Sequence, residues 1–366
     1  MSDRSLVVAQ VIPAAVGGIR THVRSLVPRL ESAGIRAPVF TPDVDAVDSP
    51  SGTTRVPIPS RVRSRGWSDA TGTLRTGLGA VAGRIGAVDV VHAHGLRAAF
   101  VADRARGRRP LVVTVHNVVL PDERGRRRRL AEGVAARILA RADRLVAPSA
   151  AVLEDLPVAL RSRAEVVVPV IEVPKPGRAP DEVRSAFSVP PGCPLIVCVA
   201  RLHRQKRLDV LAAAWEQVRA EAPGTRLVLV GEGPERPNVE AAFGAWPEVT
   251  LAGALDPATD VLAAADLVVV TSSWEAVPLV LLESVVLGTP VVSTDVGIAT
   301  EVLADPAIGT VVPSGDPDAV AVAILDRLRV GVRAPSAGSP PGTEWPAAVQ
   351  PELLVDRLID VYRNVR

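Results

Sequence analysis

Short runs of apolar residues recur along the whole chain and alternate with stretches of helical periodicity. Most runs are continuous Val, Leu and Ile, a pattern typical of strands that are buried on both faces. Helical patterns such as Ile19–Ala33 and Leu208–Glu221 lie between them. This alternation predicts parallel sheets with right-handed crossover connections. The predicted strands are Leu6–Ile12, Arg36–Phe40, Val88–His92, Leu111–His116, Arg144–Pro148, Glu165–Val170, Leu195–Ala200, Arg226–Val230, Val249–Leu251, Leu267–Thr271, Val291–Thr294 and Thr310–Val312.

The chain has 366 residues, a length that suits two domains. We predict an α/β fold in which two doubly wound parallel-sheet domains face each other across a cleft. The proline-rich stretch Pro169–Pro180 is expected to connect them, while 41–65 and 330–351 are expected to be long loops. The predicted boundaries are 1–172 for the first domain, 173–183 for the linker, 184–350 for the second domain and 351–366 for a final helix that can pack back on the first domain.

Composition excludes several classes of protein. The hydrophobic fraction of 48% and the charged fraction of 22% fit a globular core and not a disordered chain. The longest apolar stretch, Leu267–Leu287, carries Glu275 and Glu283, so no transmembrane helix is expected. The first run, Leu6–Ile12, is too short for the apolar part of a signal peptide. Two cysteines cannot supply a disulfide framework, and we expect a cytoplasmic protein.

Charge is distributed unevenly between the two halves. Residues 1–185 hold 29 Lys and Arg against 18 Asp and Glu, whereas 186–366 hold 13 against 22. The opposite signs favour two lobes that attract each other, and the basic half suits an anionic partner. The basic run Arg124–Arg129 is compatible with peripheral contact to an anionic membrane, or with a solvated surface in an arginine-rich chain. Aromatic residues make up only 3%, too few for the stacking platforms of a nucleic-acid-binding protein.

Polar residues with binding chemistry follow the predicted strands of the first half, where ligands of doubly wound sheets bind. Gly17 and Gly18 open a helix after the first strand, which suits close approach to a phosphate or a plain tight turn. A cluster of histidines at one sheet edge suits a hydroxyl-rich ligand or acid–base chemistry. No carboxylate or thiol accompanies it at the spacing of a zinc site, so no metal is expected. The histidines in question are His22, His92, His94 and His116.

The second half carries charged residues after its strands. Arg201 and Lys206 lie five residues apart between a strand end and a helix start, as in a diphosphate clamp or in a solvated basic turn. Lys206 is one of only two lysines in the chain. The turn at Gly231 follows the next strand and permits close backbone approach. The letters of Gly77–Ala82 match a dinucleotide-binding fingerprint, but no strand precedes them, so we discount that motif.

The segment Ser273–Glu283 is the most informative in the chain. Pro278 suits a first helical turn, which places Glu275 in the loop before a helix and Glu283 inside it among Val and Leu. A carboxylate in such surroundings is costly unless it is hydrogen-bonded. Its donors are a protein cation, backbone amides or ligand hydroxyls such as those of a ribose.

Together these pieces resemble glycosyltransferase family 4, a group of retaining enzymes with two Rossmann-like lobes in the arrangement called GT-B. The resemblance spans residues 17 to about 316, and it depends on the order and spacing of the motifs. The matching pieces are Gly17-Gly18 with His22, His92-Ala-His94, His116, Arg201 with Lys206, Gly231-Glu-Gly-Pro234, Glu275 with Glu283, Gly288-Thr-Pro290, Asp295-Val-Gly297 with Glu301, and Gly309–Pro313.

The resemblance implies a role for each residue. Arg201 and Lys206 would bind the donor diphosphate, Glu283 the ribose hydroxyls and Glu275 the donor sugar. The other donor-binding positions would be Gly17, Gly18, Gly231 and the amides of Leu279 and Val280. His116 would act at the reaction centre together with Arg201, Lys206 and Glu275. His22 and His94 would contact the acceptor.

We therefore expect a retaining, metal-independent hexosyltransferase without a cofactor. It would move a sugar from a UDP- or GDP-linked donor to a hydroxyl acceptor such as a glycan, a lipid-linked sugar or a small glycoside. The alternative is a nucleotide-sugar epimerase of the same fold, which needs no acceptor. A relative that only binds nucleotide sugar is a third possibility.

Overall fold

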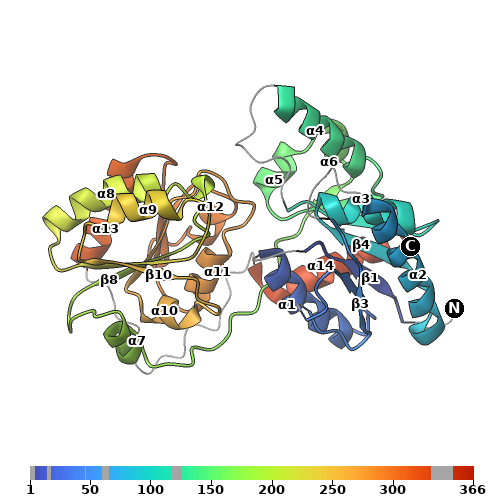
Figure 1. Cartoon of the computed structure of the whole chain (residues 1–366), viewed down its shortest axis with the longest axis horizontal. Helices are drawn as coiled ribbons and strands as arrows, with labels where there is room; N and C mark the ends of the chain where they lie inside the picture. Colours follow the sequence, from blue (N-terminus) through green and yellow to red (C-terminus); the bar gives the residue numbers. More distant parts are fainter. Residues whose placement is uncertain (1–4, 15–17, 46, 60–65, 117–125, 331–348) are drawn as a thin grey trace. The chain divides into compact units, whose positions relative to one another are not determined.

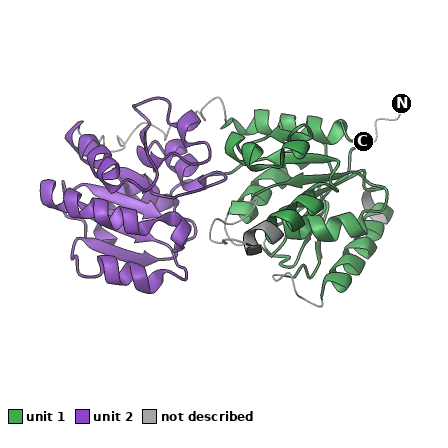
Figure 2. Ribbon diagram, turned by 90° about the horizontal axis from the view of Figure 1, so that it is seen from above, with its two compact units in different colours: residues 1–172, 349–366 green, residues 173–348 purple. Residues whose placement is uncertain are grey.

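The computed structural model describes residues 5–14, 18–45, 47–59, 66–116, 126–330 and 349–366. These residues form two units, which Figure 2 shows in separate colours. Unit 1 contains 1–172 together with 349–366, and unit 2 contains 173–348. Each unit is built on one parallel sheet, as the sequence predicts.

The sheet of unit 1 has seven strands in the order β3-β2-β1-β4-β5-β6-β7, and all neighbours are parallel. Its central strands are buried along their whole length, which explains their continuous apolar sequences. The strands are β1 (Val8–Val11), β2 (Val39–Thr41), β3 (Thr53–Arg55), β4 (Val90–His94), β5 (Leu111–Thr114), β6 (Arg144–Ala147) and β7 (Ala164–Val166).

Helices cover both faces of this sheet, and the last one comes from the end of the chain. Leu26 and Leu30 of α1 share a core cluster with Leu354 and Leu358 of α14, and Figure 1 shows these two helices next to each other. The final helix therefore belongs to unit 1. The helices of unit 1 are α1 (Gly18–Ser32), α2 (Trp67–Ile85), α3 (Leu96–Ala105), α4 (Arg126–Leu139), α5 (Ala150–Asp155), α6 (Val158–Arg161) and α14 (Pro351–Arg363).

The predicted loop at 41–65 is wrong in part, because it contains β3. This strand has only three residues, Thr53-Thr54-Arg55, and pairs on one side alone, with β2. A short polar edge strand has no hydrophobic pattern that would mark it. The discounted glycine motif lies inside α2, where a Cβ on Gly77 would come within 2.7 Å of the Phe40 ring. Gly77 therefore serves close packing of α2 on β2.

The sheet of unit 2 has six parallel strands in the order β10-β9-β8-β11-β12-β13. They are β8 (Leu195–Val199), β9 (Arg226–Val230), β10 (Val249–Gly253), β11 (Leu267–Val270), β12 (Val291–Thr294) and β13 (Gly309–Val312). Its helices are α7 (Pro180–Ala186), η1 (Arg204–Lys206), α8 (Leu208–Glu221), α9 (Arg236–Phe243), α10 (Thr259–Ala264), α11 (Leu279–Val286), α12 (Ala299–Val302) and α13 (Pro317–Val330). The linker predicted over 173–183 overlaps α7, which begins at Pro180.

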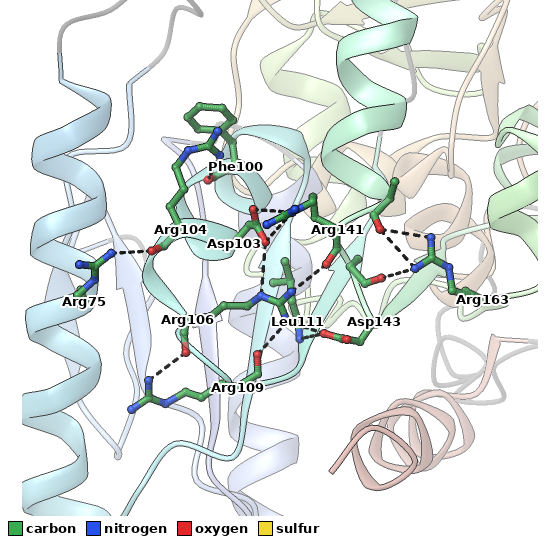
Figure 3. Close-up of polar contacts among 12 residues, drawn as sticks. Arg75, Phe100, Asp103, Arg104, Arg106, Arg109, Leu111, Arg141, Asp143 and Arg163 are labelled. Atoms are coloured by element: carbon green, nitrogen blue, oxygen red, sulfur yellow. Dashed lines mark hydrogen bonds and ion pairs between the residues drawn. The ribbon is translucent and has the colours of Figure 1, made fainter.

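Some of the arginines in the basic half have a structural role at the edge where the strands of unit 1 begin (Figure 3). Arg106 donates to the backbone oxygens of Arg109 at 2.9 Å and Arg141 at 3.0 Å, and to the carboxylate of Asp143 at 2.6 Å. The same carboxylate accepts the amide of Leu111, the first residue of β5, at 2.8 Å. These contacts satisfy carbonyls at helix and loop ends, so the charge of these arginines does not by itself indicate an anionic partner.

Candidate functional site

Each sheet reverses its strand order once, and the sequence-predicted residues gather at those points. In unit 1 the reversal lies between β1 and β4, and in unit 2 between β8 and β11. Loops that leave two adjacent strands there diverge to opposite faces and leave a crevice at the carboxyl ends. Each unit thus offers one candidate binding site at the carboxyl edge of its own sheet.

Four histidine rings lie together at the carboxyl edge of the unit 1 sheet. The ring centroids of His22, His94 and His116 are 5.6–6.0 Å apart, and His92 lies 4.2 Å from His94. His94 ends β4 and His92 lies two residues before it, His116 follows β5, and His22 is on α1. The structure thus brings together the four histidines that the sequence places at strand ends or just after the first strand.

Three of these rings have defined partners. His22 Nδ1 donates to the carbonyl of Val170 at 3.0 Å, and His94 Nε2 donates to Gln10 Oε1 at 2.9 Å. His92 uses both nitrogens, with Tyr362 Oη and Thr114 Oγ1 each at 2.7 Å. In contrast, His94 Nδ1 is buried without a hydrogen-bond partner in the described part of the chain. His116 Nε2 is in the same state.

Burial keeps these histidines neutral. Loss of solvation lowers the pKa of His22 to about 4, and the hydrogen bond that its ring donates to the Val170 carbonyl raises the pKa by less. Burial, with a smaller contribution from His22, lowers the pKa of His116 to about 3. Burial and the neighbouring histidines lower the pKa of His92 and of His94 well below the usual value. At neutral pH each ring therefore carries one N–H and one lone pair.

The first turn of α1 adds two further features. Gly18 is the first residue of the helix and is exposed, whereas Gly17 lies outside the described residues. Arg20, which was not predicted as a site residue, has a buried Nε without a hydrogen-bond partner among the described residues. The sequence carries a signal for it, because it is a cation two residues after the paired glycines.

In unit 2, Lys206 and Glu275 form an ion pair between Nζ and Oε1, with side chains that are 22% and 12% exposed. Glu275 also accepts the hydroxyl of Ser272 at 2.8 Å. The resemblance to family 4 implies that Lys206 binds the diphosphate and Glu275 the sugar, whereas their direct contact was not predicted. Ser272 was also missed, since a serine at a strand end gives no distinctive signal.

Backbone contacts fix these two loops against each other. The carbonyl of Gln205 accepts the amide of Ser273 at 2.8 Å, and Gln205 Nε2 donates to the carbonyl of Trp274 at 2.5 Å. Thr271 Oγ1 donates to the carbonyl of Lys206 at 2.9 Å. The two charged side chains are therefore held on one preformed surface.

The glycine turn after β9 supports the loop that carries Arg201. A Cβ on Gly231 would lie 1.8 Å from the carbonyl oxygen of Ala200, and one on Gly233 would lie 2.2 Å from that of Leu202. The space in front of these glycines is thus filled by the protein's own backbone. This geometry favours a supporting role for Gly231, while donor contact by Gly231 stays a prediction.

Arg201 and Glu283 lack protein partners. Arg201 is exposed, and in the described parts of the chain its guanidinium makes no hydrogen bond or ion pair. The same holds for the carboxylate of Glu283, on α11. Burial raises the pKa of Glu283, and the negative charge of Asp256 raises it further. Among the described residues, neither a protein cation nor a backbone amide donates to Glu283, and a ligand hydroxyl as its donor stays a prediction.

The first turn of α11 has backbone amides without helical acceptors, and it follows directly after the loop that carries Glu275. Pro278 precedes the helix, and Leu279 and Val280 occupy its first turn, where backbone N–H groups have no acceptor within the helix. Gly297 permits this approach, because a Cβ there would lie 2.9 Å from the carbonyl oxygen of Ala276. An anion at this helix end would be stabilised.

Two other features bear on ligands and membranes. Within the described ranges, no group of three or more His, Cys, Asp and Glu side chains is arranged to hold a metal ion. No helix in the described part is long and apolar enough to span a membrane. The run Arg124–Arg129 begins outside the described residues, so membrane contact there stays a prediction.

Comparison with known proteins assigns the family. The model described as "Glycosyltransferase Family 4" matches residues 16–173, and that described as "Glycosyl transferases group 1" matches 193–329. A D-inositol 3-phosphate glycosyltransferase from Rhodococcus erythropolis is 31% identical over 323 residues, which cover 77% of this chain and 72% of that protein. The chain belongs to glycosyltransferase family 4.

Other matches agree with the assignment to family 4. The D-inositol 3-phosphate glycosyltransferase of Nocardia farcinica is 33% identical over 286 residues. That match covers 68% of this chain and 62% of the relative, so the chain spans less than two thirds of that protein's length. The histidine cluster falls inside the first family model, and the residues from Arg201 to Glu283 fall inside the second.

Solved structures share the fold of this family 4 chain. Sucrose-phosphate synthase from Thermosynechococcus elongatus has a TM-score of 0.75 at 22% identity and covers 98% of both chains. Anabaena HepE in complex with UDP-glucose has a TM-score of 0.70 at 18% identity and also covers 98% of both. The predicted GT-B fold, with two parallel-sheet α/β domains, is thereby confirmed.

Proposed function

We propose that this family 4 chain is a retaining glycosyltransferase that moves a sugar from a UDP- or GDP-linked donor to a hydroxyl acceptor. One observation carries the proposal: Arg201 and a partly buried Glu283, both without partners among the described residues, and the Lys206–Glu275 pair belong to the loops and helix at the strand-order reversal of unit 2. A partly buried carboxylate is costly without a hydrogen-bond donor, and a ligand that donates to Glu283 would offset this cost.

The diphosphate is the first element of the proposed donor. Arg201 has no protein partner to give up, and the amides of Leu279 and Val280 are free of helical acceptors. Lys206 is held by its ion pair with Glu275 in the loop that precedes α11. Together these groups would stabilise the charge of the departing nucleoside diphosphate, where one preorganised donor contributes about 10²–10³ in rate.

Glu283 and Glu275 would then recognise hydroxyl groups. Two ribose hydroxyls would donate to the Glu283 carboxylate and offset the cost of its burial. Glu275, oriented by Lys206 and Ser272, would accept from the donor sugar. Anabaena HepE, which shares the fold, has been crystallised with UDP and with UDP-glucose, which makes UDP-glucose the first donor to test.

The proposed transfer exchanges one acetal bond for another. The bond between the anomeric carbon and the diphosphate oxygen breaks, and the acceptor oxygen forms a bond to the same carbon. The acceptor proton passes to the departing phosphate oxygen, so that attack and departure share one face and configuration is retained. We propose that Arg201, Lys206 and the helix amides meet the developing charge without a divalent metal ion.

The acceptor would bind at the histidine cluster of unit 1. Relatives named D-inositol 3-phosphate glycosyltransferase suggest a cyclic polyol, with or without phosphate, as the first acceptor to try. His116, next to the cluster at the end of β5, would contact the reacting groups. Arg20, with its unpartnered Nε, is the described cation that an anionic substituent would meet.

The test is a binding and release experiment. UDP-, GDP-, ADP- and TDP-linked sugars are screened by thermal shift, where a donor at 100 times its Kd stabilises the chain by roughly 2.7 kcal/mol. Nucleotide release is then measured with and without a polyol acceptor, which separates transfer from epimerisation. Release that depends on the acceptor and falls at least 100-fold in Arg201→Ala supports the proposal. Unchanged kcat/KM in Arg201→Ala, or the absence of binding by any nucleotide sugar, overturns it.

A further inference from the structure

The hydrogen bonds of the histidine cluster define which nitrogen of each ring carries the proton. The partner of His22 Nδ1 is the backbone oxygen of Val170, at 3.0 Å. A carbonyl oxygen has no proton to give, so Nδ1 must be the donor. In a neutral ring, the other nitrogen, Nε2, is then a lone pair that can only accept a hydrogen bond.

The same reasoning applies to His94. Its Nε2 lies 2.9 Å from Gln10 Oε1, which is also a pure acceptor. The Gln10 amide is oriented by its own NH₂ group, which faces the Val8 carbonyl at 3.5 Å and bonds to Tyr362. His94 therefore carries its proton on Nε2, and its buried, unpartnered Nδ1 is a lone pair.

Three residues hydrogen-bonded to the cluster, Gln10, Thr114 and Tyr362, hold the rings of His92 and His94 in these orientations. Tyr362, the one tyrosine of the chain, is fully buried and reaches His92 from α14. Thr114 occupies the other nitrogen of His92, so no hydrogen-bonding capacity of that ring is left for a ligand. Gln10 and Tyr362 are thus positioning residues, and among the described residues one nitrogen each of His22 and His94 keeps a lone pair without a hydrogen-bond partner.

We propose that His22 Nε2 and His94 Nδ1 form a hydroxyl-recognising subsite in which both nitrogens act only as hydrogen-bond acceptors. The proposal rests on the proposed function, because the hydroxyls to be recognised are those of the acceptor. The two rings lie 5.6 Å apart, close enough for two hydroxyls of one polyol. His94 Nδ1 is buried, and the His94 ring stacks on that of His116 with a centroid distance of 5.8 Å, so a ligand that reaches Nδ1 would have to displace neighbouring side chains.

This subsite has a definite chemical preference. A hydroxyl can donate to a lone pair, whereas a phosphate dianion has only acceptor oxygens and a fluorine substituent has no proton at all. The buried acceptor at His94 would remain unsatisfied with either of those groups, at a cost of roughly 1–3 kcal/mol. We therefore expect the subsite to bind the polyol hydroxyls and to leave any phosphate to cationic groups elsewhere.

The experiment uses the whole chain labelled with ¹⁵N-histidine, with myo-inositol and its deoxyfluoro analogues as probes. Long-range ¹H–¹⁵N spectra at pH 7 distinguish the two tautomers of each ring, and His203 in unit 2 provides a signal from outside the cluster. We expect His22 protonated on Nδ1 and His94 on Nε2. A proton on His94 Nδ1, or a charged His94 ring, overturns the proposal.

The probes test the ligand preference. Myo-inositol should shift the unprotonated nitrogen signals of His22 and His94, and at least one deoxyfluoro analogue should fail to shift them. His94→Phe should lose the response, while Thr114→Val, which alters only the partner of His92, should keep it. No response to myo-inositol up to its solubility limit, or equal responses to the deoxyfluoro analogues, overturns the subsite. Donor-dependent nucleotide release is measured separately, so the subsite and the proposed transfer can fail independently.

Discussion

Gly233→Ala should weaken the proposed donor binding, although Gly233 and the carbonyl that its new methyl group would meet are not among the proposed donor-binding groups. The added methyl carbon would lie 2.2 Å from the carbonyl oxygen of Leu202, where ordinary contact begins at 3.4 Å. The backbone must therefore shift by the difference of 1.2 Å, because the obstacle is a peptide group and not a flexible side chain. Leu202 follows Arg201 directly and is bonded to the Glu232 carbonyl at 3.0 Å, so Arg201 moves with it.

A displacement of about 1 Å in a catalytic group can cost about 10²-fold in rate, and overpacking costs typically 1–3 kcal/mol of stability. We expect a loss of that order in kcat/KM for nucleotide release, with weaker UDP binding by calorimetry. The matched control is Gly79→Ala, on exposed helix α2, where no atom lies within 4 Å of the new methyl and stability should rise by about 0.5–1 kcal/mol. Wild-type UDP affinity in Gly233→Ala would refute the reasoning.

Three further predictions follow from the buried charges and rings. Glu283→Gln should raise the thermal stability of the chain without UDP at pH 7, because it removes a partly buried negative charge. That charge destabilises the folded state only at pH values above the pKa of the unfolded carboxyl group. UDP should bind to the variant at least tenfold more weakly, because one charge-assisted hydrogen bond is lost. Lys206→Met should lower kcat/KM by a factor of 10² or more and the free energy of unfolding by about 1–3 kcal/mol. The loss of stability should be smaller than for a fully buried ion pair, because the Lys206 side chain is 22% exposed. If Lys206→Arg causes equal losses, the site does not specifically require the ammonium group of lysine. The pKa of His22 is about 4 and that of His116 about 3 in the folded chain, so on acidification both rings take up protons first in the unfolded state. The free energy of unfolding should therefore fall as the pH drops from about 6.5 towards 4, by about 1.4 kcal/mol per pH unit for each ring. Chemical denaturation across this pH range measures the effect.

The fold followed from sequence patterns because buried parallel strands leave a strong signal. Leu195–Ala200 is a continuous apolar run, as is Leu267–Val270 within the predicted strand Leu267–Thr271, and the structure places β8 and β11 there. The helix predicted at Leu208–Glu221 has the bounds of α8. The missed strand, β3, lies at a sheet edge and contains two threonines and an arginine. It forms by pairing with β2, and this pairing cannot be predicted from the residues of β3 alone.

The charged and histidine residues of the site could be selected from sequence because they stand at strand ends in a fold whose ligands bind there. Their supporting residues could not. Ser272 and Thr294 are ordinary polar residues in sequence, yet Thr294 Oγ1 bonds to the Ser272 carbonyl at 2.7 Å beneath the Glu275 loop. Gln10 could have been found from the sequence, because it is a polar residue inside an apolar strand. In the structure it is buried and hydrogen-bonded to His94.

The ion pair between Lys206 and Glu275 changes how the candidate site should be understood. A lysine that is already neutralised contributes less attraction to an incoming diphosphate than the free Arg201 does. Its contact with Glu275 instead fixes a carboxylate that would otherwise stand half-buried with one serine partner. If donor binding transfers part of the lysine's bonding to phosphate, Glu275 gains freedom to accept from the sugar in the same event. The pair thereby couples recognition of the leaving group to recognition of the sugar, and a charge-preserving change at either residue should affect both.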